Sequence, residues 1–71
     1  MYRLTCGYEI SDIDTGIFFE GYFRSLQGAK IKGTKLCKSF GSCNGCITRY
    51  VIERVNDQYS IGEVVYKKTI N

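Results

Sequence analysis

The stretch Leu36–Tyr50, LCKSFGSCNGCITRY, decides how this fold is held together, because it carries three of the four cysteines of the chain. The fourth, Cys6, lies far upstream, and the chain has no histidine. We expect a single domain spanning residues 1–71. A domain of that size buries only about 60% of the surface of its unfolded chain, so small domains usually add disulfides or a structural metal. The four thiols are the groups available for that role.

The cysteine spacing predicts a structural zinc site. The Asn-Gly dipeptide between Cys43 and Cys46 favours a tight turn, which brings the two thiolates within reach of one ion at about 2.3 Å. Cys37 adds a third ligand if the residues between loop back, and Cys6 adds a fourth. Four thiolates complete a tetrahedral site with no open position for water, so the expected Zn²⁺ is structural and not catalytic. The alternatives are two disulfides, ordinary buried thiols or an iron–sulfur cluster.

The N-terminal residues predict a half-buried strand. Apolar and polar side chains alternate from Tyr2 to Ile10 with a period of two. This pattern places Cys6 on the inward face, together with Leu4, Tyr8 and Ile10. The residues that follow are rich in Ser, Asp, Thr and Gly, whose side chains bond their own backbone or leave it free to bend. They predict a turn.

The aromatic segment after that turn has two interpretations. Apolar side chains recur there at the spacing of one helical face: Phe18, Phe19, Tyr22, Phe23 and Leu26. Gly21 in the middle, and the abundance of Ile, Phe and Tyr, favour a strand instead. We expect a short helix over 15–27, with a strand as the alternative.

The rest of the chain predicts a loop followed by an antiparallel hairpin. From Gly28 to Gly45 the sequence is rich in glycine and lysine, which indicates a loop. Residues 46–55 and 58–70 are rich in β-branched and aromatic side chains and flank Asn56-Asp57, a pair that tolerates the positive φ of a tight turn. The expected fold class is a small β-rich or α+β domain. Its antiparallel sheet has an N-terminal strand and a C-terminal hairpin, beside the short helix and a cysteine-bound metal loop.

The sequence argues against an enzyme and against a membrane protein. Histidine is absent, and the chain has no phosphate-binding glycine motif and no nucleophile elbow. The longest unbroken apolar run is Ile17-Phe18-Phe19, far short of the roughly 18 residues that cross a bilayer. No apolar stretch has the form of a secretion signal. We therefore expect a cytoplasmic protein with reduced thiols and no small-molecule substrate.

Positive charge is concentrated in one stretch, 30–38, which holds four lysines and no acidic residue. They are Lys30, Lys32, Lys35 and Lys38. A basic loop beside the rings of Phe40 and Tyr50 suits a nucleic acid, because lysines contact phosphates while a ring stacks on a base. A nucleic-acid-binding module is therefore the alternative function. The sequence pI of about 8.7 is below the value above 9 that is typical of dedicated nucleic-acid binders.

The aromatic content favours protein binding as the leading function. The chain has six Tyr and four Phe, more rings than so small a core is expected to enclose, and Tyr is enriched at interfaces. The expected contact residues are Phe18, Tyr22, Tyr59 and Tyr66. The sequence thus predicts a small, non-enzymatic, zinc-stapled protein that binds a protein partner stoichiometrically, as an inhibitor or adaptor. In size it resembles small phage proteins that block a host enzyme or a defence complex.

Overall fold

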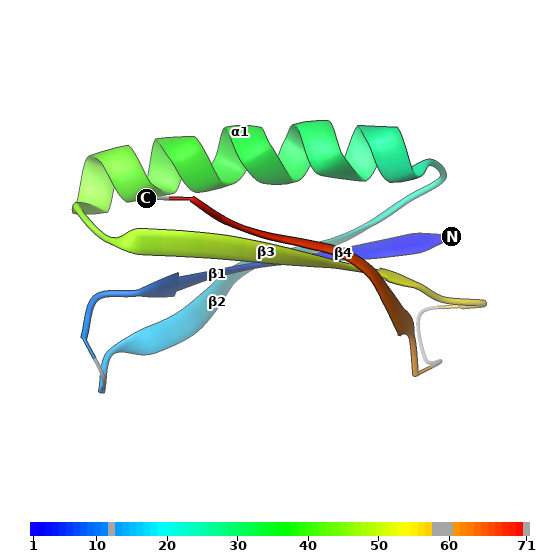
Figure 1. Ribbon diagram of the computed structural model, residues 1–71, viewed down its shortest axis with the longest axis horizontal. Helices are drawn as coiled ribbons and strands as arrows, with labels where there is room; N and C mark the ends of the chain where they lie inside the picture. Colours follow the sequence, from blue (N-terminus) through cyan, green and yellow to red (C-terminus); the bar gives the residue numbers. More distant parts are fainter. Residues whose placement is uncertain (12, 58–60, 71) are drawn as a thin grey trace.

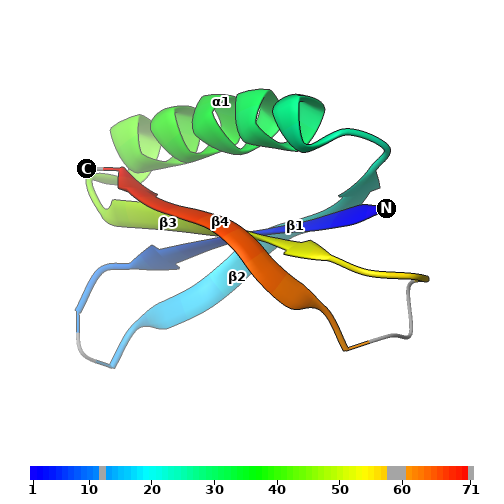
Figure 2. The ribbon, with the colours of Figure 1, turned by 45° about the vertical axis from the view of Figure 1, so that its right-hand side comes forward.

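A computed structural model describes residues 1–11, 13–57 and 61–70. Within these residues the chain forms four strands and one helix, in the order ββαββ. They are β1 (Tyr2–Glu9), β2 (Thr15–Phe23), α1 (Leu26–Asn44), β3 (Ile47–Arg54) and β4 (Glu63–Ile70). Neighbouring strands pair antiparallel in the spatial order β2-β1-β3-β4. Helix α1 lies across one face of this sheet (Figure 1, Figure 2), which makes the fold α+β.

Strand β1 is the strand that the N-terminal alternation predicts, and it lies inside the sheet between β2 and β3. Leu4 and Cys6 are fully buried. Tyr8 is half-buried, with its ring centroid 5.3 Å from that of Phe40 in α1. Ile10 was expected on the same inward face, but it lies beyond the end of β1 and is 55% exposed. That part of the prediction is wrong, because the chain has already entered the turn.

Strand β2 occupies most of the segment where a helix was expected, so the helix over 15–27 is wrong and the alternative strand is confirmed. A bulge in its pairing with β1 leaves Phe18 between the residues that pair with Cys6 and Gly7. Phe18 and its neighbour Phe19 both pack against the core cluster. A bulge turns adjacent side chains toward one face, and adjacent rings on one face are also what a helix would show. This resemblance explains the wrong prediction.

Helix α1 takes the place of the loop expected between Gly28 and Gly45, so that expectation is wrong. The side chain of Ser25 caps the N-terminus by accepting a hydrogen bond from the Gly28 amide at 3.0 Å. Gly45 ends the helix with a left-handed φ of 62°. The fully buried positions of this helix are small residues at four-residue spacing: Ala29, Gly33 and Cys37. Such residues let a helix approach the sheet closely, while Leu26 and Leu36 pack against the core beside them.

Strands β3 and β4 form the antiparallel C-terminal hairpin that the sequence predicts. The connection is longer than a tight turn, since β3 ends at Arg54 and β4 begins at Glu63. No non-glycine residue of the described chain has a positive φ, so the tight turn expected at Asn56-Asp57 is wrong. The core cluster consists of Leu4, Cys6, Ala29, Cys37, Tyr50 and Ile52. Among the described residues, no helix combines the length and the apolar character that a membrane span needs.

Candidate nucleic-acid interface

A groove of about 450 Å³ lies between α1 and the β3–β4 side of the sheet. Among the described residues, nine line it, of which four are lysines and none is acidic. They are Gln27, Lys30, Ile31, Thr34, Lys35, Lys38, Tyr50, Tyr66 and Lys68. The groove therefore combines several ammonium groups with hydroxyl and apolar surface, and none of these nine residues has a carboxylate to balance them.

Helical periodicity brings three of the four predicted lysines to this groove. Lys30, Thr34 and Lys38 are four residues apart, so they lie one above another on the side of α1 that faces β4, with Lys35 beside them. Lys32 is two residues from Lys30, about 200° around the helix axis, and it does not line the groove. The helix thus divides a stretch of lysines that the sequence presents as one group.

The fourth lysine of the groove is Lys68 of β4, which the sequence did not place with the basic stretch. Lys68 pairs with Tyr50 of β3, so its side chain leaves the sheet on the helix side, as that of Tyr66 does two residues earlier. It is exposed because β4 is the edge strand farthest along the sheet from β2. In the predicted hairpin, the alternation of Tyr66, Lys68 and Ile70 on one face of the strand would have predicted this position of Lys68.

The ammonium group of Lys30, in α1, also contacts the ring of Tyr66, in β4, across the groove. Its Nζ lies 4.2 Å from the ring centroid of Tyr66. A cation–π contact at an exposed site contributes about 0.5–1 kcal/mol. Lys35 and Lys38 of α1 and Lys68 of β4 line the same groove, and among its described lining residues no carboxylate balances them. A bound anion would interact favourably with all three.

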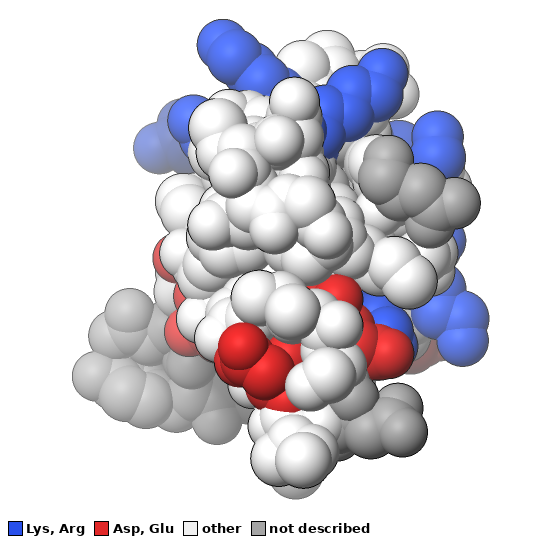
Figure 3. Space-filling model, turned by 90° about the vertical axis from the view of Figure 1, so that its left-hand side faces the viewer, with Lys and Arg blue, Asp and Glu red and all other residues white. Residues whose placement is uncertain are grey.

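Charge is unevenly distributed over the surface as a whole. In the view of Figure 3, most Lys and Arg side chains lie around the upper part of the molecule, and Asp and Glu side chains lie below, with further Lys or Arg side chains beside them at the right. Helix α1 itself contains no acidic residue. The helix side therefore presents positive charge to a polyanion, and the groove lies on this side.

Neither of the rings expected to stack on a base has a free face beside the lysines. Phe40 stacks on Phe18, with centroids 4.0 Å apart and planes 8° apart, and it does not line the groove. Tyr50 is 1% exposed, and its hydroxyl lies 3.0 Å from that of Thr34. Burial raises the pKa of Tyr50, and the hydrogen bond with Thr34 opposes that shift. Both rings serve the packing between α1 and the sheet.

The aromatic residues expected to bind a protein lie in different parts of the molecule. Phe18 packs against Phe40 in the interior, and Tyr66 lines the lysine groove. Tyr22 is 38% exposed and pairs with Arg3 in β1, which places it on the sheet face opposite α1. Tyr59 lies outside the described residues. The three described rings therefore do not form one surface.

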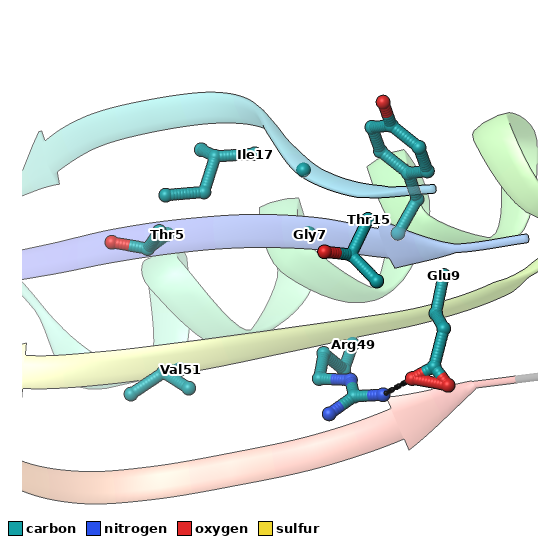
Figure 4. A pocket seen from close by; sticks show the side chains of 9 residues that line it. Thr5, Gly7, Glu9, Thr15, Ile17, Arg49 and Val51 are labelled. Atoms are coloured by element: carbon teal, nitrogen blue, oxygen red, sulfur yellow. Dashed lines mark hydrogen bonds and ion pairs between the residues drawn. The ribbon is translucent and has the colours of Figure 1, made fainter. Parts of the chain in front are cut away.

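The sheet face opposite α1 carries a second hollow, of about 390 Å³ (Figure 4). It forms where Gly7 and Gly16, on neighbouring strands, provide no side chain. Ile17, which is 67% exposed, lies on one side of it. On the other side, Arg49 and Glu9 form an ion pair with an N–O distance of 2.7 Å. This hollow is neutral overall and partly apolar, unlike the lysine groove.

The four cysteines do not meet at one point. Cys6 and Cys37 are fully buried where β1 meets α1, and their thiols share a hydrogen bond. Cys43 is six residues further along α1, about 240° around its axis, and is exposed. In the part of the chain that the structure describes, no three His, Cys, Asp or Glu side chains lie close enough to hold a metal ion. The metal loop is replaced by α1, and zinc binding stays a prediction.

Comparison of the chain with protein-family models, curated proteins and solved structures gave no match. The functional argument therefore rests on the two concave surfaces. The lysine groove is the more distinctive of them, because like charges brought together without a counter-charge lower the stability of a fold. The hollow on the opposite face has its charges paired.

Proposed function

We propose that this protein binds nucleic acid through the groove between α1 and β4. The observation that carries the proposal is the convergence of four lysines from two elements on one groove with no acidic lining residue. Because these ammonium groups repel one another, the arrangement is best explained by an anionic ligand that they hold together. The proposal keeps the alternative function drawn from the lysine stretch and replaces the expected loop by a helix face and an edge strand.

The number of lysines sets the expected strength of binding. Each ammonium that neutralises a phosphate releases condensed counterions, so the affinity falls as salt rises. Four such contacts on duplex DNA give a slope of about −3.6 for the logarithm of the binding constant against the logarithm of salt concentration. Electrostatic binding of this kind has dissociation constants of about 10⁻⁴ to 10⁻⁶ M at physiological salt. Binding is therefore best measured at low salt.

Two variants that remove the same charge from different places test the proposal. The groove variant changes three lining lysines to Gln: Lys35, Lys38 and Lys68. The control variant changes three cations that do not line the groove: Arg24, Lys32 and Lys67. Lys30 is kept in both, because its contact with Tyr66 serves the packing.

Fluorescence anisotropy with a labelled duplex at about 50 mM salt is the measurement. The groove variant is expected to lose most of its binding, and its salt slope is expected to become shallower by about 2.7, which is three contacts at 0.9 each. The control variant is expected to bind nearly as the natural chain does. Equal losses in the two variants would show attraction by net charge alone, and no binding by the natural chain at low salt would contradict the proposal.

A second candidate function is stoichiometric binding of a protein partner, as an inhibitor or adaptor, on the sheet face opposite α1. The observation that favours it is the exposure of large apolar side chains on this face: Ile17, beside the hollow, at 67%, Ile47 at 43% and Tyr22 at 38%. Apolar side chains gathered on one surface often mark a contact site. Tyr is also a favoured residue where a few side chains carry most of the binding energy.

The second candidate is tested by capture from a lysate of the source cells, with and without nuclease. A protein that remains bound after nuclease treatment is the expected partner. Its binding is expected to weaken by about 2 kcal/mol or more in Tyr22→Ala, the size of a strong interface contact, and to persist in the groove variant. A partner that disappears with nuclease would instead point to the lysine groove.

A further inference from the structure

The rings beside the lysine groove already have partners. One face of Tyr66 lies under the ammonium of Lys30, 4.2 Å from the ring centroid. Tyr50 is 1% exposed, and its ring lies 6.0 Å from that of Tyr66. Proteins that hold single strands do so by stacking successive bases on exposed aromatic rings. These two rings offer no such platform.

The other aromatic rings do not provide a platform near the groove either. Phe40 stacks on Phe18 with a centroid distance of 4.0 Å, and its ring is tilted against that of Tyr8 at 5.3 Å. Tyr22, at 38%, has the largest exposed fraction of the described aromatic residues, and it lies on the opposite sheet face. Lysines and stacking rings are therefore on different surfaces in the part of the chain that the structure describes.

The polar groups of the groove are suited to phosphates and not to base edges. Lysine is a compact, flexible point charge, whereas the bidentate reading of bases uses the fork of arginine or the amides of asparagine and glutamine. The described residues that line the groove include four lysines, no arginine and a single amide side chain, Gln27. A contact made in this way fixes the position of a backbone without reading its sequence.

Charge density and a backbone that is fixed before binding favour a duplex over a single strand as the ligand of these lysines. Lys30 and Lys38 are eight residues apart on α1, which is about 12 Å along the helix axis, and Lys68 lies on the other side of the groove. A duplex carries one charge per about 1.7 Å of its axis, twice the density of one of its strands. Its phosphates are also held in place before binding, whereas a single strand would have to be ordered without the gain from stacking.

We infer that the groove binds the phosphate backbone of double-stranded nucleic acid without reading its sequence. This inference rests on the proposed function and narrows its ligand. The lysines of α1 and β4 grip the backbone from two sides, Tyr66 supports Lys30, and the bases stay paired and outside the groove.

The experiment compares four labelled probes of equal length, about 20 nucleotides per strand, with the full chain over a series of salt concentrations. They are a DNA duplex, a duplex of scrambled sequence, one strand of the first duplex, and a poly-glutamate peptide. We expect the two duplexes to bind with affinities within about twofold, with a salt slope of about −3.6 for four contacts. We expect the single strand and the peptide to bind at least about tenfold more weakly, because both lack that charge density.

The outcomes separate the inference from the function on which it rests. Tighter binding of the single strand than of the duplex, or a preference of tenfold or more for one duplex sequence, overturns the inference and leaves nucleic-acid binding standing. Equal binding of the peptide and the duplex also overturns it, since the groove would then accept any polyanion. Absence of binding to every probe at low salt overturns both.

Discussion

At Gly33 the backbone of α1 comes as close to the sheet as the side chains beneath it allow. A Cβ atom there would lie 2.8 Å from Cδ2 of Tyr50 and 3.0 Å from Cδ1 of Leu4. Both side chains are buried in the core, where close packing resists a shift of either one. Gly inside a helix is about 1 kcal/mol less favourable than Ala. The close contact, and not helix propensity, therefore explains the residue at this position.

Gly33→Ala is expected to lower the free energy of unfolding by about 1–3 kcal/mol, the usual range for overpacking a core, although Ala is the better helix former. Urea denaturation measures the change. Ser39→Ala, on an exposed position of the same helix, is the control and is expected to be neutral or slightly stabilising. A gain in stability for Gly33→Ala would show that α1 does not pack this closely on Tyr50.

Burial of the Cys6 thiol changes its pKa and so makes the stability of the fold depend on pH. Burial, followed by the effects of the neighbouring Cys37, raises the pKa of Cys6 from 9.0 to about 12. The thiol therefore stays protonated in the folded chain at pH values where the unfolded chain begins to lose this proton. The unfolded state binds fewer protons in that range, so the free energy of unfolding falls as the pH rises above about 9.

We expect the stability of the natural chain to be level below pH 9 with respect to this group, and to decline between about pH 9 and 12. Cys6→Ala is expected to make that decline shallower, because it removes one of the groups responsible. Denaturant titrations at a series of pH values measure the slope, and the exposed Cys43→Ala serves as control. An unchanged slope in Cys6→Ala would mean that its thiol titrates alike in both states.

At the scale of the element, α1 depends on its ends more than on its middle. Its interior includes the glycines Gly28, Gly33 and Gly41, which weaken a helix. Ser25 at the start and Gly45 at the end satisfy backbone groups that would otherwise lack partners. The first turn contains no acidic residue to interact with the helix dipole, so the hydroxyl of Ser25 is the main side-chain contribution there.

Ser25→Ala is expected to lower the free energy of unfolding by about 1 kcal/mol, because the amide of Gly28 loses its acceptor. Ser25→Asp is expected to keep most of the stability, since a carboxylate accepts the same bond and also favours the positive end of the helix. Thermal melting monitored by circular dichroism compares the variants. Equal losses in both would mean that the cap does not stabilise α1.

At the scale of the whole molecule, the cysteines are divided among β1, α1 and Cys46, which lies between α1 and β3. A four-thiolate zinc site would require the C-terminal turns of α1 to unwind, so that Cys43 approaches Cys37. Cys6 and Cys37 would also have to leave their shared hydrogen bond in the core. The described arrangement and the zinc prediction therefore lead to different measurements.

Elemental analysis and one variant decide between them. With the arrangement described for α1, Cys43→Ser is expected to leave the melting temperature nearly unchanged, because Cys43 is exposed. If the zinc prediction is right, the purified protein carries about one zinc per chain, and the same substitution unfolds much of the domain. Four reactive thiols after denaturation, together with no zinc, would contradict the zinc site and the two disulfides alike.

The sequence by itself determined the parts of the protein that local patterns specify. A period of two identifies β1, and the β-branched and aromatic residues of the last third identify the β3–β4 hairpin, because each strand buries one face. The lysine stretch was also visible, and three of its four members line the groove. These features depend on residues that are neighbours along the chain, so they can be predicted before the fold is known.

Only the tertiary structure decided that residues 26–44 are a helix and which side chains meet across it. The fully buried positions of α1 are the small residues Ala29, Gly33 and Cys37, and the glycines and lysines around them are what indicated a loop. The pairing irregularity at Phe18 and the position of Lys68 depend on register with distant strands. Contacts between segments far apart in sequence determine such features, and a local sequence pattern contains no information about those contacts.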